Sequence, residues 1–183
     1  MAVVKQSLGR DLTSLALVLA LVVAGLRLLD LVPQRLAEPK GGRSYQDLAL
    51  VERRLGERLA LPAYFPQTLR WPAARIRVAG ARPALVVLAF EGASGGAERL
   101  WLAQSVGGVE EPTADLWPEG VLLDSEGVSL QQTSGTLERL LAPDGRIWQQ
   151  LRWERWGRLL LLRSTGSPEE LLALARSVRK EGP

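Results

Sequence analysis

Residues 142–164, with the sequence APDGRIWQQLRWERWGRLLLLRS, determine the fold that we expect for this chain. The segment 142–146 has the composition of a tight turn, because its proline presets φ and its glycine accepts a positive φ. Residues 147–156 follow as one strand, and Gly157 separates them from a second, apolar strand over 158–164. Strands joined by such short turns pair in the antiparallel direction, so the sequence predicts an antiparallel sheet.

The expected sheet extends toward the N-terminus. Residues 83–90 (PALVVLAF) are apolar on both faces, as in a central strand, and Leu100 alternates with Trp101 in a strand over 99–106. Further short strands are expected at 75–78, 126–132 and 135–141. Residues 107–120 are expected to form a loop, since they are rich in turn residues. The sequence therefore predicts six or seven strands in all.

The N-terminal segment is uncharged over residues 12–26 (LTSLALVLALVVAGL) and follows two basic residues, Lys5 and Arg10. As a helix this segment would rise only about 22 Å, short of the ~30 Å hydrocarbon core of a bilayer. It reaches spanning length if it continues to Val32, which places Arg27 at the far interface. We therefore expect a membrane anchor whose main residues are Leu15, Leu17, Leu19, Leu21, Val22 and Arg27.

A cleaved signal peptide is the alternative interpretation of this segment, with cleavage after Ala24 or Gly25. In either case the expected division is 1–32 as the anchor or signal segment, 33–43 as a linker with Pro, Gly and charged residues, and 44–183 as an α+β domain. The signal-like N-terminus favours a domain outside the cytoplasm. The protein would then be a single-pass protein of the cytoplasmic membrane or, after cleavage, an exported one.

Two helices are expected to flank the sheet. Ser44 is a suitable N-cap for a helix over 45–60, where Leu and Val recur at helical spacing. Ser167 caps a second helix that runs to about Lys180, with Pro at its first position and acidic residues in its first turn. The expected fold class is α+β: an N-terminal membrane helix, then a helix, a six- to seven-stranded mostly antiparallel sheet and a C-terminal packing helix.

Composition argues against several classes of function. The net charge of +3 does not indicate a nucleic-acid binder, because residues 41–183 hold 18 basic and 17 acidic residues. The chain has neither Cys nor His, so the usual thiol and imidazole nucleophiles, bases and metal ligands are missing. The acidic pairs Glu110/Glu111 and Asp124/Glu126 are interpreted as solvated loop residues. We expect no enzyme activity, no metal and no cofactor.

The six tryptophans are the best indication of a binding surface. Trp148, Arg152 and Trp156 share one face of their predicted strand, and Trp101 can join them from another strand. A face with aromatic and cationic side chains suits a protein partner or an amphipathic ligand. The alternative is that these tryptophans only cover the edges of the core.

Five different short motifs lie between residues 61 and 178. They are LPAYFP at 61–66, GTL at 135–137, LRWE at 151–154, GRL at 157–159 and the closing helix at 168–178. Together they resemble bacterial membrane-tethered domains of the anti-sigma-factor-like and lipoprotein-carrier-like groups. The resemblance implies a curved antiparallel sheet with a packing helix, and a role in sensing, regulation or hydrophobic-ligand handling outside the cytoplasm. It transfers no catalytic residue, and the cytoplasmic sigma-binding region of many such proteins has no counterpart in the first eleven residues.

Two functions are expected from these observations. The first is a membrane-anchored regulatory or interaction domain that binds a protein partner, as an accessory subunit of a membrane complex. The alternative is a carrier-like domain for a lipid or another apolar ligand, since the runs 83–90 and 159–162 are apolar on both faces. The two differ in whether the second face of the sheet is a deep apolar cavity or a filled surface.

Overall fold

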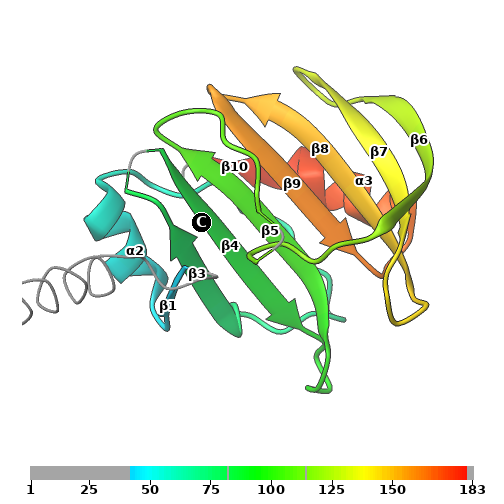
Figure 1. Ribbon diagram of the computed structural model, residues 1–183, viewed down its shortest axis with the longest axis horizontal. Coiled ribbons are helices and arrows are strands. Elements are labelled where there is room, and N and C mark those ends of the chain that lie inside the picture. Colours follow the sequence, from blue (N-terminus) through cyan, green and yellow to red (C-terminus); the bar gives the residue numbers. More distant parts are fainter. Residues whose placement is uncertain (1–41, 82, 114, 181–183) are drawn as a thin grey trace, which may run out of the picture. The chain divides into compact units, whose positions relative to one another are not determined.

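The computed structural model describes residues 42–81, 83–113 and 115–180, and these residues fold mostly as β-sheet (Figure 1). Eight strands form one antiparallel sheet, two form a small second sheet, and two short helices complete the described part of the chain. The strands are β1 (Arg43–Tyr45), β2 (Leu61–Pro62), β3 (Arg75–Ala79), β4 (Ala84–Glu91), β5 (Glu98–Val106), β6 (Val121–Ser129), β7 (Ser134–Leu141), β8 (Ile147–Arg155), β9 (Arg158–Ser164) and β10 (Val178–Arg179), and the helices are α2 (Leu48–Leu55) and α3 (Pro168–Ser177).

The large sheet joins two groups of neighbouring strands. Its order is β1-β3-β4-β5-β9-β8-β7-β6, so the groups meet where β5 pairs with β9. Leu102 of β5 lies opposite Leu162 of β9 at this junction. Because β5 is in the middle of the sheet and β6 is at its edge, residues 107–120 have to cross from one to the other. This crossing segment determines what covers one face of the sheet.

Hairpin turns in the second group of strands follow from local sequence. The predicted turn at 142–146 is present: Gly145 has a φ of 81° and donates its N–H to the carbonyl of Ala142. The turn between β8 and β9 places both Trp156 (φ 55°) and Gly157 (φ 66°) in the left-handed region. Two successive residues with positive φ give a two-residue hairpin whose twist matches that of its strands.

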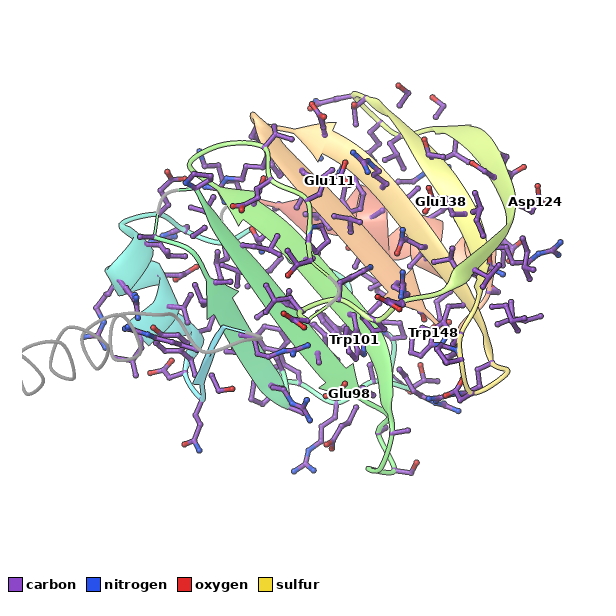
Figure 2. All side chains as sticks on the ribbon, in the orientation of Figure 1. Glu98, Trp101, Glu111, Asp124, Glu138 and Trp148 are labelled. Carbon is purple, nitrogen blue, oxygen red and sulfur yellow. The ribbon has the colours of Figure 1, made fainter. Side chains whose placement is uncertain are left out.

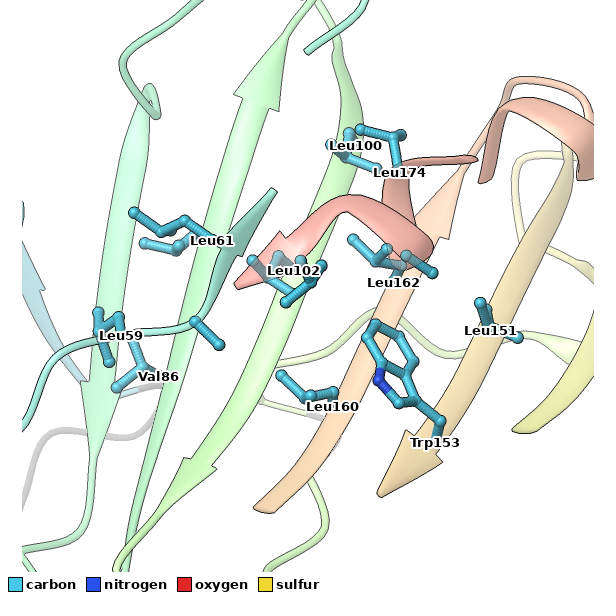
Figure 3. Close-up of a cluster of buried hydrophobic side chains, with 14 of the residues drawn as sticks. Leu59, Leu61, Val86, Leu100, Leu102, Leu151, Trp153, Leu160, Leu162 and Leu174 are labelled. Atoms are coloured by element: carbon cyan, nitrogen blue, oxygen red, sulfur yellow. The ribbon is translucent and has the colours of Figure 1, made fainter. Parts of the chain in front are cut away.

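The main core lies between the sheet and α3. Ser167 caps this helix, because its side chain accepts a hydrogen bond from the Glu170 N–H, and Pro168 occupies the first turn. These features confirm the predicted start of the helix. Leu171 and Leu174 are buried against the sheet. The strand residues in this cluster include Leu100, Leu102, Leu151, Trp153, Leu160 and Leu162 (Figure 3).

The first helix is shorter than the sequence predicts. Instead of covering 45–60, α2 begins after the N-cap Asp47 and ends at Gly56, whose φ is 69°. Beyond Gly56 the buried side chain of Gln104 bonds to both the N–H and the carbonyl of Ala60, at 2.8 and 3.0 Å. The apolar residues keep helical spacing past Gly56, but the left-handed cap ends the helix and the hydrogen bonds to Gln104 hold the following segment against β5.

The expected α+β fold class is wrong for the described residues, since they contain ten strands and only two short helices. The sheet has eight strands rather than six or seven, because strands as short as β1 carry no periodic pattern that the sequence could reveal. The expected N-terminal membrane helix is not seen: within the described ranges, no helix has both the length and the apolar composition that a membrane crossing needs. The segment assigned to it lies outside those ranges, with its anchor residues Leu15, Leu17, Leu19, Leu21, Val22 and Arg27.

Candidate functional site

The second face of the sheet is covered by the chain itself. Residues 107–120, described except for residue 114, run across this face from β5 to β6 (Figure 1). Leu116 and Trp117 of this covering segment are buried there. They belong to a second cluster with Leu85, Val87, Ala103, Leu159 and Leu161. The apolar runs of β4 and β9 are therefore buried on both faces and line no exposed groove.

Polar contacts hold the covering segment to the sheet. Arg77 of β3 donates to the carbonyls of Asp115 and Leu116, at 3.0 and 2.7 Å. Glu111 forms an ion pair with Arg152 of β8. The hydrogen bond from Arg152 lowers the pKa of Glu111 below its usual value, and the same bond raises the pKa of Arg152. The middle of the segment is thus attached to two different strands, β3 and β8.

A buried polar network lies beneath this segment. The Oε1 atom of Gln150 accepts hydrogen bonds from Trp117 Nε1 and from Arg163 Nε, both at 2.9 Å, and Gln150 Nε2 donates to Glu138 at 2.6 Å. Arg163 also donates to the carbonyl of Pro118, and its guanidinium lies 5.1 Å from the centre of the Trp117 ring. Arg163 is only 4% exposed, and this burial lowers its pKa to about 10. Arg163 forms no ion pair with any described residue. Its charge is stabilised by the oxygens of Gln150 and Pro118, by the Trp117 ring and by the nearby Glu138 carboxylate, which acts to raise its pKa.

Two of the four predicted surface residues come together at one hollow. Trp101 of β5 and Trp148 of β8 both line an open hollow of about 340 Å³ on the covered face (Figure 2). Trp148 is only 5% exposed, so it forms part of the wall rather than a protruding contact. The Nε1 atom of Trp101 is buried and finds no hydrogen-bond acceptor among the described residues. The hollow therefore has an aromatic wall.

The charges around this hollow are mostly paired. Glu98 forms an ion pair with Arg75 at 3.4 Å, and Asp144 forms one with Arg146 at 2.6 Å. The Arg146 guanidinium also lies 5.5 Å from the centre of the Trp148 ring. No group of three or more acidic residues that could hold a metal ion occurs in the described part of the chain. A hollow that is open and has charged walls differs from the deep apolar cavity that a lipid needs.

The other two predicted surface residues lie elsewhere. Arg152 is engaged by Glu111 and does not line the hollow. Trp156 is 39% exposed in the turn after β8, with the Arg155 guanidinium 4.3 Å from the centre of its ring. Strand alternation ends at Arg155, so it does not extend to Trp156 as the sequence predicted. The four residues of the predicted surface therefore lie in three separate places: Trp101 and Trp148 at the hollow, Arg152 beside Glu111, and Trp156 in the turn after β8.

Large apolar side chains are exposed at one corner of the sheet. We call this group the edge patch: Val121 (66% exposed), Leu122 (55%), Leu123 (47%), Leu141 (37%) and Ile147 (52%). Val121 lies opposite Leu141, and Leu141 lies opposite Ile147. Residues directly opposite in neighbouring strands point to the same face. Three of the five therefore form one continuous apolar row across β6, β7 and β8.

Sequence reasoning missed the edge patch. It predicted a strand over 126–132, whereas β6 occupies Val121–Ser129. Asp124 and Glu126 therefore belong to a strand and not to a loop. The run VLL at 121–123 is the one signal in the sequence, but a short apolar run without alternation does not distinguish a buried strand from an exposed one.

Comparison of the chain with protein-family models, with curated proteins and with solved structures finds no match. What the described residues define is an eight-stranded antiparallel sheet that carries α3 on one face, a covering segment on the other, and an exposed apolar corner at its free edge.

Proposed function

We propose that this chain is a non-catalytic interaction domain that binds a protein partner through the edge patch, as a regulatory or accessory subunit at a membrane. The edge patch is the observation that carries the proposal. Single exposed apolar residues are ordinary on protein surfaces, whereas a contiguous group at the free edge of a sheet is typical of an interaction site. The patch combines side chains from three strands, so it gives a partner a continuous apolar contact.

Attachment to a membrane is the part of the proposal that rests on sequence. Residues 12–26 carry no charge and follow Lys5 and Arg10, a pattern that directs a chain to a membrane or across it. The domain would then act outside the cytoplasm, either attached to the cytoplasmic membrane or exported. A partner in or near that membrane is expected, because attachment raises the local concentration of the domain at the membrane surface.

Binding of a lipid is the alternative function, and two observations favour a protein over a lipid. The covering segment occupies the face that a lipid groove would need, with Leu116 and Trp117 buried against β4 and β9. The hollow at Trp101 and Trp148 is open and has charged walls. A protein interface tolerates such a surface better than an acyl chain does.

Site-specific photocrosslinking tests the proposal in the full chain, in the cells that produce it. A benzophenone amino acid replaces Ile147 in the edge patch, or Leu50 on α2 as a control. Leu50 is a matched position because it is 49% exposed and apolar, while α2 contacts β1 at the other end of the strand order. We expect a covalent adduct with one protein at Ile147 and none at Leu50.

A further substitution makes the result specific to the edge patch. Leu141→Ser removes the neighbour of Ile147 in the apolar row without removing a core side chain, and it should abolish the adduct. Equal crosslinking at Ile147 and Leu50 would contradict the proposal. Recovery of lipid adducts alone at Ile147 would contradict it in favour of the lipid alternative.

A further inference from the structure

We infer that the partner adds an extended segment to the free edge of β6, with basic side chains that face Asp124 and Glu126. This inference rests on the proposed function, because it specifies how a partner at the edge patch is held and what chemistry its contact segment carries. Strand addition takes its affinity from main-chain hydrogen bonds and its specificity from alternate side chains. Three features of β6 support it: an open edge, outward backbone groups and acidic side chains.

The outer edge of β6 is open, since this strand is the last of the large sheet (Figure 1). Every residue of β6 except Val128 is exposed. On the outer side of β6, one backbone group has a hydrogen-bond partner among the described residues, and that partner is in the same strand. It is the Ser125 N–H, which donates to Asp124 Oδ1 at 2.8 Å. A Cβ at Gly127 would have no atom within 4 Å. The sheet face at Gly127 is therefore uncrowded, and the open edge itself follows from the strand order.

The backbone groups that face outward can be identified from the hairpin that follows β6. The Leu130 N–H donates to the Thr133 carbonyl at 2.8 Å, and these two residues continue the β6–β7 register. In an antiparallel ladder only every second residue bonds to a given neighbour. Counting back from Leu130, the N–H and carbonyl groups of Ser125, Gly127 and Ser129 face away from β7. Their three carbonyls and the N–H groups of Gly127 and Ser129 provide the acceptors and donors for an added strand, while the Ser125 N–H bonds to Asp124 Oδ1.

Two side chains of β6 are acidic, Asp124 (Figure 2) and Glu126. Asp124 and Glu126 lie opposite Arg139 and Leu137 of β7, and all four line an open hollow of about 160 Å³. Arg139 approaches Asp124 only to 3.8 Å, with both side chains more than half exposed, so this ion pair is weak. Glu126 forms no ion pair with any described residue. The excess negative charge favours a strand with Lys or Arg at alternate positions.

A second copy of this chain is disfavoured as the occupant. β6 has no Lys or Arg, so no register of two β6 strands places a basic side chain opposite Asp124 or Glu126. Pairing about Ser125 would even place Asp124 of each copy opposite Glu126 of the other, and like charges directly opposite are destabilising. A different protein can match the acids with basic residues. The same segment would carry apolar side chains at its other end, next to the exposed Leu122 and Leu123 of the edge patch.

The main experiment repeats the crosslinking at Ile147 in the full chain with two substitutions at one position. Gly127→Pro removes an outward N–H and places a ring on the open edge, while the bonds to β7 remain. Gly127→Ala is the matched control, because it keeps the N–H. We expect the proline variant to lower the adduct yield by at least about tenfold and the alanine variant to keep it. Circular dichroism and thermal unfolding establish that both variants fold.

The outcomes separate this inference from the proposed function. An undiminished adduct in a folded Gly127→Pro variant overturns strand addition and leaves the edge patch as the binding surface. Absence of any adduct in the unsubstituted chain overturns the proposed function itself. If the proline variant does not fold, the double variant Asp124→Lys with Glu126→Lys replaces it. That variant should lose the adduct because it would repel a basic segment, and an unchanged or greater yield would overturn the inference.

Two synthetic peptides test the charge preference directly on the full chain. One has the sequence VKVKVLL, the other has Glu in place of Lys, and both are acetylated and amidated. We expect the basic peptide to bind about tenfold more tightly at low salt, with a smaller preference at high salt. Its binding should slow amide hydrogen exchange at Gly127 and Ser129. Equal binding of the two peptides, or no binding of either at millimolar concentration, would overturn the charge preference.

Discussion

Gln150 of β8 and Arg163 of β9 lie directly opposite each other, and the side-chain oxygen of Gln150 accepts two hydrogen bonds from the Arg163 guanidinium. The same oxygen accepts the indole N–H of Trp117, and Arg163 also bonds to the carbonyl of Pro118. This pair therefore anchors the covering segment to the sheet. Together with the Arg77 and Glu111 contacts and the burial of Leu116 and Trp117, it holds in place the segment that fills the second face.

Gln150→Leu should destabilise the domain strongly. The substitution leaves a buried guanidinium and a buried indole N–H without their shared acceptor, at a cost of about 3 kcal/mol in the free energy of unfolding. Urea denaturation measures this free energy. Gln149→Leu is the control, because Gln149 is half-buried on the other face of the same strand, and it should change the value by less than about 1 kcal/mol. Equal effects of the two substitutions would contradict the anchoring role.

Gln104→Leu should also lower the free energy of unfolding, by about 2 to 4 kcal/mol. The fully buried amide of Gln104 is the partner of both backbone groups of Ala60, which would be left unsatisfied near β5. Gln131→Leu in an exposed turn is the matched control and should be nearly neutral. A neutral Gln104→Leu in urea denaturation would mean that the segment after α2 is held by its other contacts, such as the bonds from Arg158 to the Arg58 carbonyl and from the Leu59 N–H to Glu52.

The ion pair of Glu111 with Arg152 should make stability depend on acid pH. Because Arg152 lowers the pKa of Glu111 in the folded state, the stabilisation is fully present above the unfolded-state pKa of 4.5 and is lost as the pH falls through the folded-state pKa. Glu111 is largely exposed, so the effect amounts to a few tenths of a kcal/mol. Glu111→Gln should therefore be less stable than the unsubstituted chain at pH about 7 and equal to it at pH about 2.

Urea unfolding at several pH values measures this difference, with Glu110→Gln as the control. Glu110 is the neighbouring residue and forms no ion pair with a described residue. Glu110→Gln should change the free energy of unfolding by an amount that does not shrink to zero as the pH falls in the way expected for Glu111→Gln. If the Glu111→Gln difference grew on acidification, the ion pair would not be the source of the pH dependence.

Trp156 is the one non-glycine residue with a positive φ in the described part of the chain, and its replacement should separate backbone strain from side-chain contacts. Trp156→Asn and Trp156→Ala both remove the contact with Arg155, but Asn tolerates the left-handed conformation better than Ala. We expect the Asn variant to be more stable than the Ala variant by about 0.5 to 1 kcal/mol in thermal or urea unfolding. An Ala variant of equal stability would mean that the turn relaxes out of this conformation.

Local features of the fold were predictable because a few neighbouring residues determine them. The turn around Gly145 and the start of α3 at Ser167 follow from turn and cap chemistry within four residues. The end of α2 was missed for the opposite reason. Apolar spacing alone continues to Leu59, whereas the Gly56 cap and the bonds from Gln104 to Ala60 end the helix and hold the chain beyond it.

The candidate site was less predictable than the fold. Trp101 and Trp148 do meet at one hollow, but the polar side chains that organise that face come from separate strands and from the covering segment. The run VLL at 121–123 does not by itself predict the edge patch, because exposure of Val121 and Ile147 depends on which strands end the sheet.

The sequence by itself determined the turn at 142–146, which runs are apolar on both faces and where α3 begins, since these depend on local backbone preferences and on side-chain type. Only the tertiary structure decided that β5 pairs with β9, that residues 107–120 cover the second face and that β6 is left at a free edge. Strand order is set by contacts between residues far apart along the chain, and no local pattern encodes it. For this reason the apolar run at 121–123 became an exposed corner and the run at 159–162 became core.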